Sequence, residues 1–266
     1  MSALDPTELL AAYDDQLRAR VPERLPEGEV VERVGPLLRF HGGAGDQGWV
    51  LYRELGGIGG AELDELIAQQ VAFFRDRGER FEWKYHGHDL PADLPERLLA
   101  AGFVAEPRET IVIAEVDAIA SEPVLPAGVT LREVTERADF ERIAGMEQGV
   151  WNDDHGWLPD MLEGERTVDP DSITVVVAEA GEAVVCAGWI RFDPHTEFGT
   201  LWGGATLAEY RRRGIYRATV AYRANLAQAR GKRYLETDAS DDSNPILQRL
   251  GFVPVTTTTP YIWSPG

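Results

Sequence analysis

The sequence predicts a mixed α/β fold, and three features of the chain point to it. Short apolar runs, such as those at residues 129–134 and 183–192, show the alternation expected of strands. The run at residues 199–207 is followed by apolar residues at helical spacing, which predicts a helix at residues 215–229. Strands in series, followed by alternating strands and helices, are typical of a mixed sheet with helices on both faces.

The second half of the chain supplies most of the expected elements. We expect strands at residues 129–134, 173–179, 183–192, 199–207, 234–239 and 256–263. We expect helices at residues 139–149, 215–229 and 246–250. After the first of these helices we expect a loop that carries aromatic, acidic and histidine side chains, namely Trp151, Asp153, Asp154, His155 and Trp157.

The first half repeats part of this pattern. Residues 77–83 resemble residues 230–236, because in each an arginine and a glycine end a helix before a strand begins. Around them we expect a strand, a glycine-rich turn, two helices and a strand, at residues 49–55, 56–60, 61–77, 91–101 and 110–115. A repeat on this scale predicts two domains, residues 1–118 and 129–266, joined by a Pro/Gly-rich linker at residues 119–128.

The composition limits the classes of function. The chain has 266 residues and a formal net charge of −19, which argues against binding to nucleic acids or anionic membranes, because both require a cationic surface. The single cysteine, Cys186, lies in an apolar run, so we expect it to be buried. The histidines lack the spacing of metal ligands, and we expect no metal site. No signal peptide or membrane span is recognisable, so we expect a cytoplasmic monomer or homodimer.

The most informative stretch is the basic loop at residues 206–217, where an apolar strand meets a helix. The first N–H groups of a helix lack backbone partners, and the helix dipole adds partial positive charge there. Gly214 permits close approach of a ligand, and the neighbouring arginines, Arg211, Arg212 and Arg213, can bond phosphate oxygens in pairs. This combination predicts a pyrophosphate site.

The stretch Tyr210–Ala218 resembles the coenzyme A loop of the GCN5-related N-acetyltransferases, whose pattern is Arg or Gln, two residues, Gly, one residue, then Gly or Ala. Tyr216 departs from the last position. Asn244 and the pair Gly251-Phe252 match later features of the family. The resemblance covers about residues 129–263 and implies two GNAT-like acyl-CoA acyltransferase domains. The first is degenerate, because its glycine-rich turn lacks the arginine.

The resemblance also implies a set of ligand-binding residues. In the family, the sheet splays open after the fourth strand, and the pantetheine arm of coenzyme A inserts there. Acetyl-CoA is therefore the expected co-substrate, and its acetyl group is passed directly to an amine of a small molecule or peptide. The residues implied to bind it are Thr206, Leu207, Ala208, Arg211, Arg212, Arg213, Gly214, Ile215, Tyr216, Arg217 and Asn244.

The catalytic residues follow less directly from the resemblance. The family often has a tyrosine acid where this chain has Leu247, so Tyr216, Ser243 and Ser240 are the alternative proton donors. The candidate bases lie in the segment that forms the acceptor wall in the family, namely Glu147, Asp153, Asp154 and His155. Nearby tryptophans could shape an aromatic acceptor pocket, although we expect Trp189 and Trp202 to be core residues because they lie on strands.

Three functions are compatible with these features. The first is an N-acetyltransferase. The second is a non-catalytic acyl-CoA-binding protein, which Leu247 would favour. The third, a thiol-metabolite synthase, is suggested only by the tandem layout, and one fold can host several activities. Because residues 56–60 contain no arginine, we also expect the first half to bind no coenzyme A.

Overall fold

The computed structural model describes residues 5–43 and 47–266 and confirms the predicted mixed α/β fold. The chain divides into two compact units that are not contiguous in sequence. Unit 1 comprises Met1–Val112, Asp238–Leu247 and Val253–Gly266, and unit 2 comprises Ile113–Thr237 and Gln248–Phe252. Three elements, β6 (Glu109–Glu115), β11 (Tyr234–Ala239) and α8 (Asn244–Leu250), have residues in both units.

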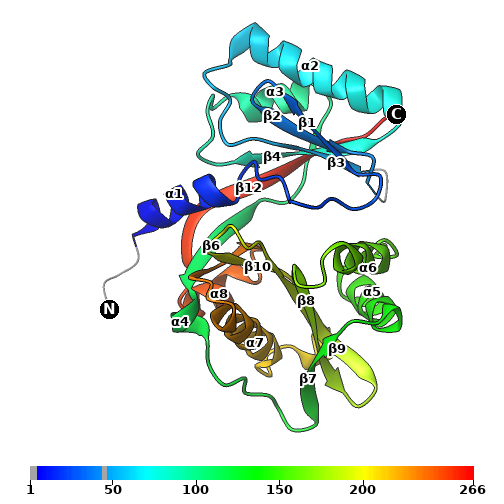
Figure 1. The fold of residues 1–266 in the computed structure, drawn as a ribbon, viewed down its shortest axis with the longest axis vertical. Helices are drawn as coiled ribbons and strands as arrows, with labels where there is room; N and C mark the ends of the chain where they lie inside the picture. Colours follow the sequence, from blue (N-terminus) through cyan, green and yellow to red (C-terminus); the bar gives the residue numbers. More distant parts are fainter. Residues whose placement is uncertain (1–4, 44–46) are drawn as a thin grey trace. The chain divides into compact units, whose positions relative to one another are not determined.

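Unit 1 is built on a sheet in the order β1-β2-β3-β4-β12 (Figure 1). Its strands are β1 (Val30–Val34), β2 (Leu37–His41), β3 (Gln47–Leu51), β4 (Arg80–His86), β5 (Val104–Ala105) and β12 (Val253–Trp263). Only β3 and β4 are parallel neighbours, and β5 pairs with β12. Its helices are α1 (Pro6–Gln16), α2 (Gly60–Arg77) and α3 (Leu94–Ala100).

The core of unit 1 lies between this sheet and α2. The rings of Phe74 on α2 and Phe81 on β4 stack with their centroids 4.1 Å apart. Gly78 ends α2 in the left-handed conformation, with φ of 70°, and the chain turns directly into β4. Tyr261 and Trp263 of β12 belong to the same apolar cluster, so the last strand completes this core.

Unit 2 contains an antiparallel ladder of four strands, extended by a parallel fifth. The strand order is β11-β10-β9-β8-β7, and only the β10–β11 pair is parallel. Besides β11, the strands are β7 (Val129–Val134), β8 (Ile173–Ala180), β9 (Ala183–Phe192) and β10 (Phe198–Thr206). The helices are α4 (Val116–Ile119), α5 (Arg137–Trp151), α6 (Leu158–Val168), the short 3₁₀ turn η1 (Ala208–Tyr210) and α7 (Ile215–Ala229).

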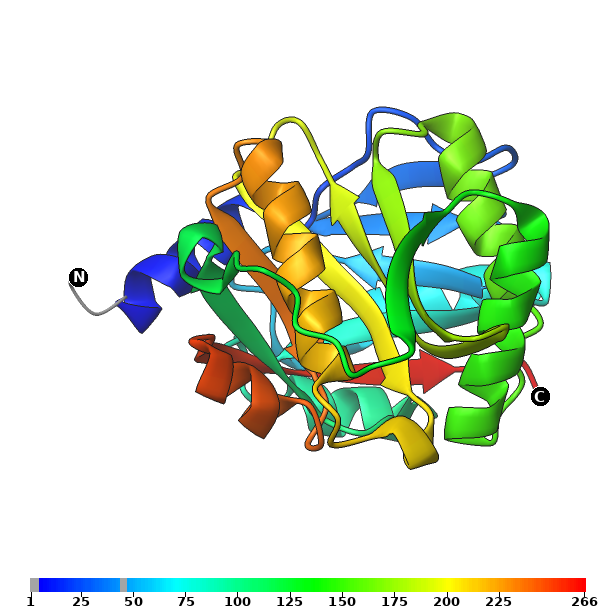
Figure 2. The same cartoon turned by 90° about the horizontal axis from the view of Figure 1, so that it is seen from below.

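Helices cover both faces of the sheet in unit 2 (Figure 2). Because side chains alternate along a strand, neighbouring residues of β8 and β9 enter different cores. Val175, Val177 and Ala187 pack with residues of α5 and α6. Ala178 and Cys186 pack on the other face with Ile215 of α7. Cys186 is fully buried, as predicted.

The expected elements were found with some differences. The predicted bounds of β7, α7 and β11 agree with the structure, but the predicted strand at residues 49–55 is displaced to Gln47–Leu51. Seven of the described elements were not predicted: α1, β1, β2, β5, α4, α6 and η1. The compact units also differ from the two sequence halves, because the final strand belongs to unit 1. No helix in the described part of the chain is long and apolar enough to span a bilayer.

Candidate functional site

The candidate site begins where β10 leaves its neighbours. The parallel ladder between β10 and β11 pairs only Phe198 with Tyr234, Gly199 with Leu235 and Thr200 with Glu236. On the other side, the register with β9 shifts between Gly203 and Ala205, which is a β-bulge. The second half of β10, as far as Thr206, therefore runs beyond the paired part of β11. This is the splay that the family resemblance implied.

The N-terminus of α7 follows this splayed strand. Gly214 precedes the helix with φ of 84°, a left-handed conformation that favours glycine. The first backbone bond at this end runs from Ala218 N–H to Gly214 O at 2.9 Å. The N–H groups of Ile215, Tyr216 and Arg217 therefore have no carbonyl partner within the helix. Three free donors at the positive end of a 15-residue helix suit a pyrophosphate.

The four arginines of the loop have different surroundings. Arg211 donates from Nε to the carbonyl of Thr206 at 3.0 Å and so joins the loop to the end of β10. The Arg213 guanidinium lies 5.1 Å from the centre of the Tyr210 ring. Arg212, with φ of 62°, is exposed, as is Arg217. These side chains place positive charge beside the helix N-terminus, where the sequence predicted it.

A cavity of about 360 Å³ lies against the outer side of α7 in unit 2. Arg217 and Ala218 line it from the first turns of the helix, and Ser121 and Val124 line it from the segment before β7. Arg217 and Glu122 contribute charged side chains to the cavity lining, and Ala218, Val220 and Ala221 contribute apolar ones along the helix. It provides room for part of a ligand beside the N-terminus of α7.

Tyr216 points into the sheet rather than out of the loop. A Cβ atom on Gly204 of the β10 bulge would lie 2.8 Å from Cε2 of the Tyr216 ring, so glycine is required there for this packing. Burial raises the pKa of the Tyr216 hydroxyl, and the nearby charge of Arg223 opposes this shift. The hydroxyl is thus protonated over a wide pH range and can act as a proton donor close to the bulge.

Arg223 was missed by the sequence analysis. It lies two turns along α7 from Tyr216, only 1% of its surface is exposed, and it donates to the carbonyls of Trp189 and Trp202. The sequence does contain one indication that Arg223 is buried. Arg223 lies on the helix face that also carries the apolar residues Val220, Ala224 and Ala227.

Glu147 is the most deeply buried of the candidate bases. It lies on α5, with 4% of its surface exposed, and its Oε2 accepts a hydrogen bond from Trp151 Nε1 at 2.7 Å. Oε1 has no hydrogen-bond partner in the described structure. Burial raises the pKa of Glu147, while the Trp151 bond and the nearby His155 oppose the rise. A carboxylate with a raised pKa and a free oxygen is suited to accept a proton.

Of the other candidate residues in this segment, Asp153, Asp154 and Trp157 are exposed and His155 is half-buried. Asp153 and Asp154 bond to the backbone of their own turn, and His155 stacks on Trp157 with ring centroids 6.0 Å apart. The prediction for Trp189 is confirmed, because it is buried. The prediction for Trp202 was wrong: 43% of its surface is exposed, and Arg191 covers its ring at 4.6 Å. Its place on a strand did not bury it, and its Nε1 donates to Thr200 Oγ1 at 2.9 Å in an exposed contact.

Ser243, Asn244 and Leu247 lie in unit 1 and are described with it. The Ser243 N–H is 3.4 Å from Ser240 Oγ, and the carbonyl of Ser240 accepts the N–H groups of Ser243 and Asn244, so both serines shape the start of α8. Asn244 is the first residue of α8 and donates from Nδ2 to Thr110 Oγ1 at 3.2 Å. Leu247 is buried. The Ser243 hydroxyl donates to the Ser240 carbonyl at 3.3 Å, so it is engaged within the turn that precedes α8.

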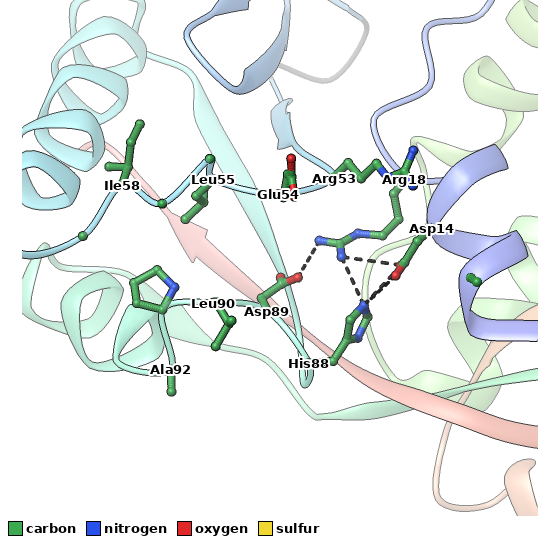
Figure 3. Close-up of a pocket in the computed structure, with 15 residues that line it drawn as sticks. Asp14, Arg18, Arg53, Glu54, Leu55, Ile58, His88, Asp89, Leu90 and Ala92 are labelled. Atoms are coloured by element: carbon green, nitrogen blue, oxygen red, sulfur yellow. Dashed lines mark hydrogen bonds and ion pairs between the residues drawn. The ribbon is translucent and has the colours of Figure 1, made fainter. Parts of the chain in front are cut away.

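Unit 1 has a larger cavity, of about 820 Å³, at the predicted glycine-rich turn (Figure 3). It is lined by residues 53–59, by His88 to Ala92, and by side chains from α1 and the segment after it. Two arginines reach it. Arg18 Nη2 lies 2.7 Å from Asp89 Oδ1, and Arg53 Nη1 lies 2.8 Å from Asp15 Oδ1. Both cations are thus already paired with carboxylates.

Asp89 is the centre of the polar network beside this cavity. Its Oδ2 accepts bonds from the Tyr52 hydroxyl at 2.6 Å and from the backbone N–H of His86 at 2.9 Å. Burial alone would raise the pKa of Asp89, but the bonds from His86 and Tyr52 and the charge of Arg18 lower it to about 2. Among the described residues, no group of three or more side chains is arranged to hold a metal ion.

Comparison with known proteins identifies the fold. The model of the acetyltransferase (GNAT) family matches residues 135–252, which include the splayed strand, the basic loop and α7. No curated protein matches the sequence. Three solved structures resemble the whole chain, at identities that show a shared fold alone.

The first of these structures is a GCN5-related N-acetyltransferase from Kribbella flavida, with a TM-score of 0.64 and 17% identity over 100% of this chain and 97% of that one. A functionally unknown protein from Staphylococcus epidermidis has a TM-score of 0.63 and 13% identity, over 97% and 98%. A tandem GNAT protein from the clavulanic acid biosynthesis pathway has a TM-score of 0.61 and 15% identity, over 100% and 97%. The chain is therefore similar to the GNAT acetyltransferase family over residues 135–252, and its fold as a whole resembles that of a tandem GNAT protein.

Proposed function

We propose that the protein is an acyl-CoA-dependent N-acetyltransferase that acts on an amine of a small molecule or peptide. The observation that supports this best is the N-terminus of α7, which follows a splayed strand and combines free N–H groups, Gly214 and exposed arginines. Acetyl-CoA fits this arrangement as the co-substrate. The pyrophosphate would be held by the loop from Arg211 to Arg217, and the pantetheine by Thr206, Leu207 and Ala208.

The reaction needs two proton transfers, for which the site offers two side chains. The amine nitrogen forms a bond to the thioester carbon, the carbon–sulfur bond breaks, and its electron pair stays on sulfur. Glu147 takes the proton that the amine loses, and Tyr216 gives its hydroxyl proton to the sulfur. The products are an amide and a thiol, and proton exchange with solvent restores both side chains. Ser243 is a weaker candidate for the acid, because its hydroxyl donates to the Ser240 carbonyl of its own turn.

We propose that the acceptor approaches from the side of α5 and α6. Glu147 lies there, and so do the exposed rings of Trp151 and Trp157. Exposed tryptophans bind cations and flat apolar groups. We also propose that the sequence halves 1–118 and 129–266 descend from one duplicated domain, and that the protein is a cytoplasmic monomer or homodimer.

The proposal is tested by calorimetric titration with acetyl-CoA, using two variants of Gly214. Gly214→Asn and Gly214→Asp add side chains of the same shape, and both residues tolerate positive φ better than most. Open space surrounds the position, since the nearest atom to an added Cβ is Val124 O at 3.9 Å. We expect Gly214→Asp to abolish binding and Gly214→Asn to retain it, because only the aspartate repels a pyrophosphate.

The outcomes separate the proposal from its alternative. If both variants bind as the natural chain does, the loop is not the coenzyme A site. If acetyl-CoA binds but no amine in a panel of polyamines, aminoglycosides and peptides is acetylated, the chain is a non-catalytic acyl-CoA-binding protein. The buried Leu247, in place of the family's tyrosine, is the observation that favours this alternative.

A further inference from the structure

Arg223 on α7 carries a buried charge that the proposed reaction has not used. Its side chain is packed inside unit 2, and none of the described carboxylates forms an ion pair with it. Arginine is almost never fully buried unless it is paired, because removing its charge from water is costly. Burial lowers the pKa of Arg223, and the titratable neighbours that oppose this are Tyr216 and Cys186. An unpaired charge kept in the interior calls for a function.

The hydrogen bonds of Arg223 all go to backbone carbonyls. Nε donates to Thr219 O at 3.1 Å, one turn earlier in α7. Nη1 donates to Trp189 O at 3.1 Å and to Trp202 O at 3.0 Å. Trp189 and Trp202 face each other in the β9–β10 ladder, immediately before the register shift at Gly203. Arg223 therefore satisfies two carbonyls, one from each strand, beside the bulge, where regular pairing is interrupted.

The strands leave space for this side chain and for Tyr216. A Cβ atom on Gly188 would lie 2.7 Å from Arg223 Nη1, and one on Gly204 would lie 2.8 Å from the Tyr216 ring. Both contacts are shorter than real Cβ contacts, so only glycine fits at either position. Two side chains of α7 thus enter the sheet at two glycines, Gly188 of β9 and Gly204 within the β10 bulge. This arrangement fixes the guanidinium and the phenol on the same side of the strand that splays.

We propose that Arg223 is a positioning residue for acyl transfer: it fixes the shape of the β10 bulge and keeps a permanent positive charge beside Tyr216. This inference rests on the proposed function. When Tyr216 gives up its proton, its oxygen becomes negative in an environment that contains little water. A fixed positive charge nearby stabilises that product, and it does so without rearrangement at the moment of reaction.

The charge and the hydrogen bonds of Arg223 can be separated by substitution. Arg223→Met keeps much of the volume and removes both. Arg223→Lys keeps the charge but has no planar group to bond two carbonyls. We expect kcat to fall about 100-fold in Arg223→Met and clearly less in Arg223→Lys, with the Kd of acetyl-CoA changed less than about threefold in both. Arg233→Met is the matched control, because Arg233 is exposed and its ion pair with Glu197 is 3.7 Å long.

A second measurement reports the charge without any need for catalysis. Cys186 is the single cysteine, so Tyr216→Cys in a Cys186→Ala chain places one thiol at position 216. Its pKa is measured from the ¹³Cβ chemical shift as the pH is raised. A positive charge favours the thiolate. We expect the acid dissociation constant of this thiol to fall about tenfold when Arg223→Met is added.

The two measurements distinguish the possible failures. If the thiol at position 216 titrates alike with and without Arg223, the charge does not act there and the inference is wrong. The same holds if folded Arg223→Met retains full kcat. If the pKa of the thiol depends on Arg223 but neither the natural chain nor its variants bind acetyl-CoA, Arg223 does place a positive charge beside position 216 and the proposed function is wrong. Thermal unfolding of each variant shows whether it is folded, and Arg223→Lys keeps the kinetic comparison valid if Arg223→Met is not.

Discussion

Glu147 shows how its surroundings give one acidic side chain properties that most others lack. The chain has 45 aspartates and glutamates, and most of them are solvated or paired with arginine. Glu147 instead lies on the buried face of α5, where Oε2 has a single hydrogen-bond partner, Trp151, and Oε1 has none in the described structure. In the sequence, Glu147 is one of four candidate bases in a single segment. The sequence could not rank these bases, because their ranking depends on burial, and burial depends on which face of α5 meets the sheet.

We predict that Glu147→Gln lowers kcat about 100-fold, within the usual range for loss of a general base. Glutamine has the same shape and can still accept the bond from Trp151, so binding of acetyl-CoA is expected to be unchanged. Since burial raises the pKa of Glu147, the natural protein should lose activity as pH falls through a value above the ordinary 4.5. The reaction rate is measured as a function of pH for both proteins. If Glu147→Gln loses activity at low pH in the same way as the natural protein, Glu147 is not the base.

The lowered pKa of Asp89 leads to a prediction about the stability of the fold. Its pKa is lowered from 3.8 to about 2 in the folded protein. A lowered carboxyl pKa stabilises the fold at pH values above the unfolded pKa, and this contribution is lost as pH falls from about 4 to about 2. We predict that Asp89→Asn lowers the free energy of unfolding by about 2 kcal/mol at pH 7, and that the deficit shrinks over this range.

Urea unfolding at pH 7, 4 and 2.5, followed by circular dichroism, measures this deficit. The control is Asp15→Asn, because Asp15 and its partner Arg53 are largely exposed and such pairs contribute little. A deficit for Asp89→Asn that is the same at all three pH values would show that packing around Arg18, rather than the carboxylate charge, is what the substitution disturbs.

At the scale of elements, α7 packs closely on strands β9 and β10 because large side chains of the helix lie against glycines of the strands. Arg223 and Tyr216 lie over Gly188 and Gly204, and Gly203 has its own close neighbour, the Trp189 ring. The helix could be predicted from apolar spacing with the bounds that the structure has. The bulge could not be predicted. The three glycines of β10, Gly199, Gly203 and Gly204, indicate an irregular strand but do not show which side chains pack against it.

We predict that Gly188→Ala destabilises the protein by about 2 kcal/mol, in the range of overpacked cores. The added methyl would lie 2.7 Å from Arg223 Nη1 and 3.2 Å from the backbone nitrogen of Gly204, so either the guanidinium or the bulge must move. Gly149→Ala is the control, since Gly149 lies within α5 with no atom near its Cβ position, and alanine favours helix there. Equal midpoints of urea unfolding for the two variants would disprove the tight fit.

Most of the other elements could also be predicted, and the omissions have physical reasons. The strands at β1 and β2 carry Glu32, Arg33 and Arg39, so their apolar alternation is weak. Helix α6 begins with Leu158-Pro159 directly after an aromatic loop, and that segment was not assigned to any element. The basic loop that we propose binds coenzyme A was recognisable because its residues lie in one continuous stretch. Arg223 was not, because its role depends on carbonyls from two other strands.

At the scale of the whole molecule, the tandem layout makes a prediction about stoichiometry. The cavity in unit 1 lies at the glycine-rich turn that we propose to correspond to the basic loop of unit 2. Its buried arginine, Arg18, is paired with Asp89, whereas Arg53 pairs with Asp15 in an exposed contact. Arg18 is therefore not available to a pyrophosphate. We predict that calorimetry finds one acetyl-CoA per chain, and that Arg18→Gln leaves its affinity unchanged. A stoichiometry of two, or loss of one of two sites in Arg18→Gln, would contradict this.

The position of β12 has a consequence for how the protein is made. Residues 253–263 leave the ribosome after almost all of unit 2, yet they pair with β4 from Thr258 opposite His86 to Trp263 opposite Phe81. During synthesis, one edge of β4 therefore stays unpaired while about 170 further residues are added, and the core around Phe81 lacks Tyr261 and Trp263. Unit 2 can form its ladder from β7 to β10 in the meantime. Unit 1, whose first residues are synthesised before those of unit 2, is therefore the unit that completes its sheet last.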